Sequence, residues 1–394
     1  MGMVNPFISA YAVQLGASSS EMGWFQSSAN ISNNVLQVIW GKMSDKLGRR
    51  APYIILGNLI IMALWIPMMF VTNAAQLIVL VAVQALLGSM ATPTWVALIG
   101  DLVPSTRLGR VSASISLWAS LGTLVATLLS GYVMIIVGGS LQQMFLIPFV
   151  VAILCGLISA LVMIPVRERG NKRYPSSSTR TEGFFSIFVQ VRTAPDFMKY
   201  SFASTVFNFF MAIGWPLFSI TLIRVLEASM WEIALLSAVQ LAAAIVFQMQ
   251  MGKLADSLGR KPLIVAFRLS LVTVPLGYAF APNVYCLIAL EAFWGISMAV
   301  GQASMTAYML DVIPEQHRGS FAAFHNLLIG VASFFGSLLG GYLADYAVGL
   351  LGVVLGLQIV YLISAVGRGV GAATYLTLKE TLNKNGGSDG CPSG

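Results

Sequence analysis

One acidic side chain lies deep inside an apolar stretch of this sequence. Glu291 belongs to the segment CLIALEAFWGIS and is the only charged residue between Arg268 and Asp311. A carboxylate in an apolar environment is costly unless it is protonated or paired with a cation. Glu291 is therefore a candidate proton carrier or substrate-binding residue. The alternative is a structural ion pair with Arg224, which lies near the end of another apolar stretch.

The sequence gives little support for other kinds of chemistry. Cys155, Cys286 and Cys391 offer neither a disulfide framework nor the spacing of a metal site. The two histidines and the isolated Glu291 do not form a catalytic cluster, and the sequence contains no Walker-type phosphate loop. We therefore expect no enzymatic activity, no metal and no cofactor. Any uphill work would have to draw on an ion gradient.

The composition places these residues in a membrane protein. Hydrophobic residues make up 57% of the 394 residues and charged residues only 9%, whereas soluble domains carry roughly a quarter charged residues. Residues 111–166 contain no acidic or basic side chain at all. Because a water-soluble particle of this size would lack a solvated surface, the sequence indicates an all-α membrane protein that crosses the bilayer many times.

Apolar segments of suitable length predict twelve transmembrane helices. We predict them at residues 1–16, 21–41, 51–71, 76–99, 112–137, 143–165, 198–223, 230–252, 262–281, 284–308, 320–344 and 352–378. The polar segment 166–197 is predicted to be a linker. The sequence thus predicts a six-span bundle at 1–165, a second at 198–378, and a tail at 379–394.

The positive charges indicate the orientation in the membrane. Of the 22 Lys and Arg residues, all but Arg224 and Arg368 lie in or near every second loop, the linker or the tail. Basic loops stay in the cytoplasm, so the linker and the carboxyl terminus are predicted to be cytoplasmic. The net charge of +7 then reflects topology rather than nucleic-acid binding. We expect a monomer in the lipid bilayer of the plasma membrane.

The second half of the sequence repeats the first. Residues Gly41–Arg50 (GKMSDKLGRR) and Gly252–Lys261 (GKLADSLGRK) share six of ten positions at an offset of 211. Two further matches, at an offset of 210, join Asp101–Pro104 to Asp311–Pro314 and Leu129–Tyr132 to Leu339–Tyr342. These in-phase matches indicate two bundles of common ancestry with the same orientation.

The repeat also predicts that the first span is short. Pro216 lies well inside the seventh span, whereas its counterpart Pro6 has only five residues before it. By this comparison part of the first span is absent, and we expect a truncated or mis-assigned start.

The repeated loop resembles a known family signature. The pattern Gly-x-x-x-Asp-x-x-Gly-Arg-Arg/Lys, between spans 2 and 3 and again between spans 8 and 9, is similar to the signature loop of the major facilitator superfamily. The Asp-x-x-Pro segments that follow spans 4 and 10 resemble that family's second loop pattern. The resemblance covers nearly the whole chain and implies two pseudo-symmetric six-helix bundles around a central cavity.

The resemblance implies a gating role for the repeated loop. In the family its aspartate faces the amino end of a helix in the opposite bundle and closes the cytoplasmic side, where the helix dipole favours an anion. Asp45 would then face the helix that begins near Ser320, and Asp256 the helix that begins near Ser112. The residues expected to form the gate are Gly41, Asp45, Gly48, Arg49, Arg50, Gly252, Asp256, Gly259, Arg260 and Lys261. Alternatively, the basic residues among them only set the topology.

The same resemblance places spans 1, 4, 7 and 10 around the cavity, so Glu291 would line it. Weaker candidates for substrate contact, each of which could instead be packed or locally hydrogen-bonded, are Gln84, Trp95, Asn208, Trp294 and Gln302. Val81 stands at the repeat position of Glu291, where many proton-driven exporters of the family have an arginine. Antiport is therefore compatible with the sequence without being specifically supported by it.

Other residues receive structural interpretations. Arg268 and Arg368 fall on spans that the resemblance places on the outside, and their side chains are expected to extend to the membrane interface. The pairs Gly336–Gly340 and Gly352–Gly356 are expected at close contacts between helices.

We interpret the sequence as a secondary active transporter that moves a small solute by alternating access. A proton or ion gradient is the expected energy source. Export of an amphipathic compound is favoured over nutrient uptake because the expected cavity carries few charges. The alternatives are an uptake permease of the same fold and a transporter-like receptor that binds its ligand without flux.

Overall fold

The fold is helical throughout the described part of the chain. The computed structural model describes residues 2–36, 40, 43–44, 50–165, 191–192, 194–313 and 318–381. Before the linker it contains α1 (Asn5–Gln14), α2 (Ser19–Ile31), the π-helical turn η1 (Ser32–Leu36), α4 (Ala51–Met68), α5 (Ala74–Gly88), α6 (Ala91–Leu102), α7 (Ser105–Val137) and α8 (Leu141–Met163). After the linker follow α10 (Pro195–Ile220), the π-helical turn η2 (Thr221–Val225), α11 (Met230–Leu258), α12 (Arg260–Ser270), α13 (Thr273–Phe280), α14 (Val284–Val312), α15 (Arg318–Leu351), α16 (Val353–Thr374) and the 3-10 turn η4 (Tyr375–Thr377).

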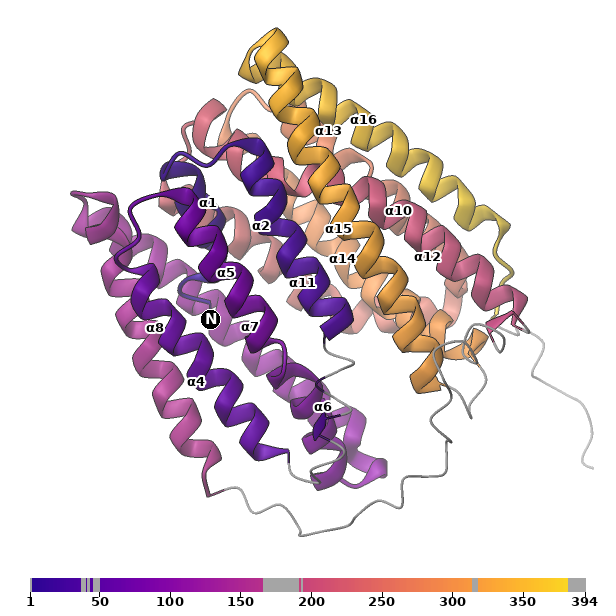
Figure 1. The fold of residues 1–394 in the computed structure, drawn as a ribbon. Helices are drawn as coiled ribbons and strands as arrows, with labels where there is room; N and C mark the ends of the chain where they lie inside the picture. Colours follow the sequence, from indigo (N-terminus) through magenta and orange to yellow (C-terminus); the bar gives the residue numbers. More distant parts are fainter. Residues whose placement is uncertain are drawn as a thin grey trace, which may run out of the picture.

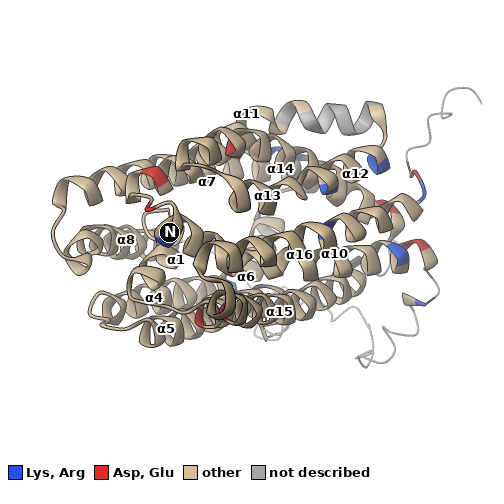
Figure 2. Ribbon diagram, turned by 90° about the horizontal axis from the view of Figure 1, so that it is seen from above, with Lys and Arg blue, Asp and Glu red and all other residues tan. Residues whose placement is uncertain are grey.

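The helices have the length and composition of membrane spans. Within the described ranges, ten helical segments are long and apolar enough to cross a bilayer. The first two predicted spans correspond to α1, which has 10 residues, and to α2 with η1. Figure 2 shows how little of the described helical bundle carries charge. The all-helical fold and the approximate number of spans agree with the prediction.

Two predicted spans are broken helices. Residues 76–99 divide between α5 and α6, and residues 262–281 between α12 and α13. In a continuous helix, the backbone N–H groups of residues 93 and 275 would donate to the carbonyls of Ser89 and Leu271. Both residues are prolines and have no N–H, so these hydrogen bonds are missing. Each stretch still forms one candidate membrane span, as predicted, but apolar composition alone does not report a break within it.

The two bundles meet through equivalent pairs of helices. In Figure 1, α2 lies beside α15; the second pair is α7 with α11. Gly341 of α15 lies against the backbone of Ser19 and Gly23 in α2. Gly131 of α7 lies against Met230 and Ala234 of α11. These residues are related by the same offsets, 210 and 211, as the sequence repeat. The packing therefore has the pseudo-symmetry that the repeat predicted.

Hydrogen bonds between the bundles gather toward one end of the molecule. We call the end where α2 and α11 begin the far end, and the opposite end, where α8 ends and α10 begins, the linker end. Asp345 of α15 accepts the backbone N–H groups of Ser19 (2.8 Å) and Ser20 (2.9 Å) at the start of α2, and Arg224 donates to the carbonyl of Ala17 (2.6 Å). Among the described residues, every hydrogen bond between the bundles uses α1, α2 or the turn joining them. Toward the linker end the two sets of helices diverge in Figure 1.

The two glycine pairs behave differently. Gly336 and Gly340 of α15 lie against the carbonyls of Phe209 and Ile213 in α10, which confirms the prediction of close helix packing. For the second pair it is confirmed for Gly356 alone, which lies in α16 against the backbone of Ala347 and Val348 in α15. Gly352 makes no such contact; it has φ +81° in the turn between α15 and α16, a conformation that glycine tolerates.

Substituting Gly340 by alanine is expected to destabilise the protein. The new methyl group would meet the backbone of Ile213, which cannot move aside as a flexible side chain would. We expect a loss of about 1–3 kcal/mol in the free energy of unfolding, the usual cost of overpacking. The measurement is the thermal unfolding midpoint in detergent. Gly349→Ala, where no atom lies within 4 Å of the new methyl group, is the control and should unfold like the wild type.

Candidate functional site

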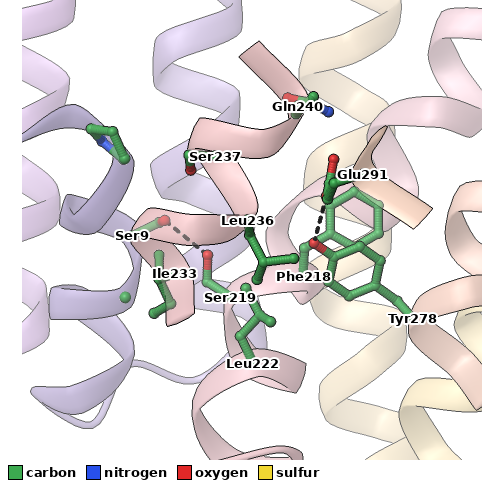
Figure 3. A pocket seen from close by; sticks show the side chains of 12 residues that line it. Ser9, Phe218, Ser219, Leu222, Ile233, Leu236, Ser237, Gln240, Tyr278 and Glu291 are labelled. Carbon is green, nitrogen blue, oxygen red and sulfur yellow. Dashed lines mark hydrogen bonds between the residues drawn. The ribbon is translucent and has the colours of Figure 1, made fainter. Parts of the chain in front are cut away.

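A cavity of about 160 Å³ lies between the two bundles. Figure 3 shows its lining, which comes from α1 on one side and from α10, η2, α11, α13 and α14 on the other. The lining residues are Pro6, Ser9, Ala10, Phe218, Ser219, Leu222, Ile233, Leu236, Ser237, Gln240, Tyr278 and Glu291. These residues include one carboxylate and several hydroxyl and amide groups, but no lysine or arginine. The cavity can therefore hydrogen-bond a small polar solute and attract a positive charge.

Two serines related by the sequence repeat join the bundles at the cavity. Ser219 of α10 donates a hydrogen bond to Ser9 of α1 at 2.8 Å. Their separation of 210 residues is the offset of the repeat and also relates Pro6 to Pro216. Because equivalent residues meet where a pseudo-twofold axis passes, the cavity lies at the axis between the bundles. A solute bound here would contact both bundles.

Glu291 reaches the cavity from α14. This helix begins after Asn283, whose side chain accepts the backbone N–H of Cys286 (3.0 Å). Helical spacing then places Leu287, Glu291 and Trp294 on one buried face. Glu291 is 7% exposed and receives a hydrogen bond of 3.5 Å from the hydroxyl of Tyr278 to its Oε1. Its Oε2 has no hydrogen-bond partner among the described residues.

An aromatic stack supports the hydrogen-bond donor of Glu291. The ring of Tyr278 stacks on that of Phe218 with 4.3 Å between centroids and on that of Trp294 with 6.1 Å. The indole N–H of Trp294 donates to the hydroxyl of Thr273 at 3.0 Å. Stacked rings in a buried site keep water out and restrict the side chains. The carboxylate therefore lies in a fixed apolar frame, with one oxygen available for a proton or a cationic group.

The structure places most of the other candidates away from this cavity. Of the seven residues proposed from the sequence for substrate or proton contact, Glu291 alone is part of the described lining. Gln84 donates to the carbonyl of Ile61 (3.2 Å), and Asn208 to that of Ser204 (2.8 Å). Trp294 lies behind Tyr278, while Trp95 and Gln302 are exposed at other positions. Substrate contact by these residues stays a prediction.

The structural ion pair proposed for Glu291 is not present among the described residues. Arg224 donates instead to the backbone carbonyl of Ala17 at 2.6 Å, which joins η2 to the turn after α1. The positive charge of Arg224 is thus used at the contact between the bundles. Glu291 has Tyr278 as its described hydrogen-bond partner, a neutral one.

The prediction for Arg268 and Arg368 was wrong. Both are buried, at 4% and 1% exposure, and neither extends to the membrane interface. Arg268 lies over the rings of Phe207 and Tyr375, and Arg368 donates to the carbonyls of Leu271 and Met211. Aromatic faces and backbone carbonyls inside the second bundle can bind a guanidinium. These partners lie nearer to both arginines than the membrane interface does.

Much of the predicted gate falls outside the described residues. This applies to Gly41, Asp45, Gly48 and Arg49, and to the side chain of Asp256, while Gly252 belongs to α11. Arg50 donates to the hydroxyl of Ser44 at 3.0 Å. The contacts that the resemblance implies for the two aspartates therefore stay a prediction.

The second copy of the loop takes part in a network within its own bundle. Gly259 has φ +102°, which glycine tolerates, and this turn starts α12. Arg260 forms an ion pair with Asp311 at the end of α14. The carboxylate of Glu380 accepts the backbone N–H groups of Arg260 and Lys261 at 3.0 and 3.1 Å. The loop thus fastens the linker-end tips of α12 and α14 to the segment after η4.

Sequence reasoning missed several residues of the cavity lining. Tyr278, Ser237 and Gln240 line the cavity but carry no signal that separates them from ordinary polar residues in a span. Ser9 and Ser219 do carry one, because they share the repeat offset of Pro6 and Pro216. A systematic comparison of polar residues at that offset would have found them.

Comparison with known proteins gives consistent results. A family model described as Major Facilitator Superfamily matches residues 1–229 and 200–389. The multidrug resistance protein MdtG of Dickeya zeae is 26% identical over 357 residues, which cover 86% of this chain and 82% of that protein. Among solved structures, a variant of the nucleoside transporter NupG has a TM-score of 0.75 at 13% identity, covering 96% of this chain and 95% of that one. The xylose transporter XylE from E. coli in an inward open conformation has a TM-score of 0.67 at 15% identity, covering 97% and 95%.

Proposed function

The chain belongs to the Major Facilitator Superfamily and is therefore a membrane transporter and not an enzyme, and we propose that it moves a small solute by alternating access driven by an ion gradient. The observation that carries this proposal is the arrangement of the bundles. They are joined toward the far end, they diverge toward the linker end, and a cavity lies between them. Rocking of pseudo-symmetric bundles about a central site would expose that cavity to each side in turn.

The distribution of charge supports an orientation. Lysines and arginines gather in the linker, the tail and the loops on the same side, which supports a cytoplasmic linker end. With that orientation the structure would represent a state closed toward the outside. In this proposal residues 1–165 and 198–378 are the moving bundles, 166–197 is the cytoplasmic linker and 379–394 is the cytoplasmic tail. The plasma membrane is the proposed location.

Glu291 is the proposed site of coupling. It is the one carboxylate of the cavity lining, and its Oε2 has no partner among the described residues. A proton on Glu291 and a positive group of the solute would compete for the same oxygen, which is a simple way to couple two fluxes. The sequence contains no Walker-type phosphate loop, so a gradient is the proposed energy source.

Export is the direction that we propose. The similarity to MdtG over most of both chains supports it. Uptake of a small hydrophilic solute is the second candidate, favoured by the polar side chains of Ser9, Ser219, Ser237 and Gln240 in the lining. The idea of an apolar cavity, on which the sequence-based preference for amphipathic compounds rested, receives less support from this lining.

Solute flux in sealed vesicles tests the function. The full chain is reconstituted in lipid vesicles with an imposed pH gradient, and entry and exit of radiolabelled cationic, neutral and anionic solutes are followed. We expect gradient-dependent flux of at least one small polar solute, and none in vesicles without protein. Binding of a solute without flux would instead identify a receptor, and flux independent of every ion gradient would exclude a secondary active transporter.

A further inference from the structure

A buried arginine in α16 has no role in the cavity and yet is firmly held. Arg368 is 1% exposed, and its described hydrogen-bond partners are backbone carbonyls rather than carboxylates. Placing a guanidinium inside a membrane bundle is costly, so such residues usually serve a function. The identity of the carbonyls indicates which one.

Arg368 replaces a hydrogen bond that a proline removes. Its Nη1 donates to the carbonyl of Leu271 at 2.9 Å. In a continuous helix this carbonyl would accept the N–H of residue 275, which is Pro275 and has none. The Nη2 of Arg368 donates to the carbonyl of Met211 in α10 at 3.0 Å. The guanidinium thus fixes the break between α12 and α13 relative to α10.

A second residue of α16 holds the other end of α13. Gln358 donates from Nε2 to the carbonyl of Ala279 at 2.9 Å. Together Arg368 and Gln358 hold α13 just before its first residue and near its last. Because the break after α12 interrupts the backbone hydrogen bonding, the orientation of the 8-residue α13 depends on such contacts.

The short helix α13 in turn supports the carboxylate of the cavity. Thr273 at its start accepts the indole N–H of Trp294, and Tyr278 near its end donates to Glu291. Both contacts connect α13 to the face of α14 that carries Glu291. A shift of α13 would therefore move Tyr278 away from Glu291 without any substitution among the cavity-lining residues.

We propose that Arg368 and Gln358 are positioning residues for Glu291, acting through α13. The span that carries them does not line the described cavity, and their effect is exerted through Tyr278. The importance of this arrangement for transport rests on the proposed function of Glu291, whereas the structural link does not.

The test measures how fast dicyclohexylcarbodiimide modifies Glu291. The full chain in lipid vesicles is treated at a fixed alkaline pH, at which the reaction rate follows the small protonated fraction of the carboxyl group, and modification of Glu291 is followed by mass spectrometry of its peptide. The reagent reacts with protonated carboxyl groups in apolar surroundings. A hydrogen bond donated to a carboxylate favours the charged form, so loss of the Tyr278 contact should speed the reaction.

We expect Arg368→Gln and Gln358→Met each to raise the rate of Glu291 modification by about threefold. This is the effect expected for loss of the long hydrogen bond from Tyr278 to Glu291. Tyr278→Phe should have the same effect alone and no further effect when combined with Arg368→Gln, because all act through one contact. Arg368→Lys, which can still donate to Leu271, should restore part of the wild-type rate.

Ser364→Ala is the matched control. Ser364 is a buried residue of the same helix and donates to the carbonyl of Phe210 at 2.7 Å, but among the described residues it makes no hydrogen bond to α13. Its loss should lower thermal stability and leave the modification rate unchanged. An unchanged rate in folded Arg368→Gln, or an equal acceleration in Ser364→Ala, would overturn the proposal. If Arg368→Gln does not fold, Gln358→Met and Arg368→Lys decide the question by the same criterion.

The two proposals can fail separately. If Glu291 proves unnecessary for gradient-driven flux while the modification rates change as expected, the coupling role is wrong and the positioning role stands. If flux depends on Glu291 but the rates do not respond to Arg368 or Gln358, only the positioning role is wrong.

Discussion

Glutamine in place of Glu291 is expected to reduce transport driven by a pH gradient strongly while leaving downhill exchange of the solute. Glutamine keeps the size and hydrogen-bonding capacity of the side chain, but it cannot bind or release a proton. Glu291 is the one carboxylate of the described cavity lining, and its Oε2 has no partner among the described residues. Gradient-driven accumulation should fall by about 5- to 150-fold, the usual range of coupling between two ligands.

The experiment compares two modes of transport in the same vesicles. Accumulation is measured under an imposed pH gradient, and counterflow of labelled against unlabelled solute is measured without one. Glu227→Gln is the control, because it removes an exposed carboxylate from the loop between η2 and α11. It should leave both modes unchanged. Accumulation by Glu291→Gln at the wild-type level would remove Glu291 from the coupling mechanism.

Asparagine in place of Asp345 is expected to favour opening of the far end. The carboxylate of Asp345 in α15 accepts the backbone N–H groups of Ser19 and Ser20 at 2.8 and 2.9 Å, across the two bundles. These N–H groups begin α2, where the helix dipole also favours a negative charge. Asparagine has no charge and only one acceptor oxygen. The substitution should cost the closed state about 1.5 kcal/mol, the contribution of a hydrogen bond to a charged group. The population of the closed state relative to the open state should therefore fall about tenfold.

Access to the cavity from the far side reports this change. Cys155, Cys286 and Cys391 are first replaced by serine, and a single cysteine is placed at Ser237 in the cavity lining. A membrane-impermeant maleimide added outside right-side-out vesicles should label this cysteine several-fold faster in Asp345→Asn. Tyr342→Phe removes a more exposed hydrogen bond, from Trp24, at the same interface and should change labelling little. Equal labelling of Asp345→Asn and its parent would show that this contact does not hold the far end closed.

The overall fold followed from patterns that extend over many residues. Long apolar segments with basic loops between them predict a bundle of membrane helices, because the bilayer admits few other structures. The repeat of Gly41–Arg50 at Gly252–Lys261 predicted two equivalent bundles, and the equivalent contacts of Gly131 and Gly341 confirm it. Helix breaks at Pro93 and Pro275 were missed because apolar composition does not register a single missing N–H.

Single polar residues were harder to place. Glu291 stood out because an isolated carboxylate in an apolar span has few structural uses, and it does line the cavity. Arg224, Arg268 and Arg368 were assigned to the wrong partners or surroundings. Their actual partners are backbone carbonyls and aromatic rings. Those groups are present in every span, so the sequence gives no indication of which one a guanidinium will find.

The sequence by itself determined that the chain is a duplicated helical membrane protein with one carboxylate deep in an apolar span. These properties depend on composition and period, which are local or repeated along the chain. Only the tertiary structure decided that Ser9 meets Ser219, that Tyr278 serves Glu291 and that α16 holds α13. Each of these contacts joins residues on different helices, and their meeting depends on how the helices pack, rotate and break. A pattern along one helix does not encode that geometry.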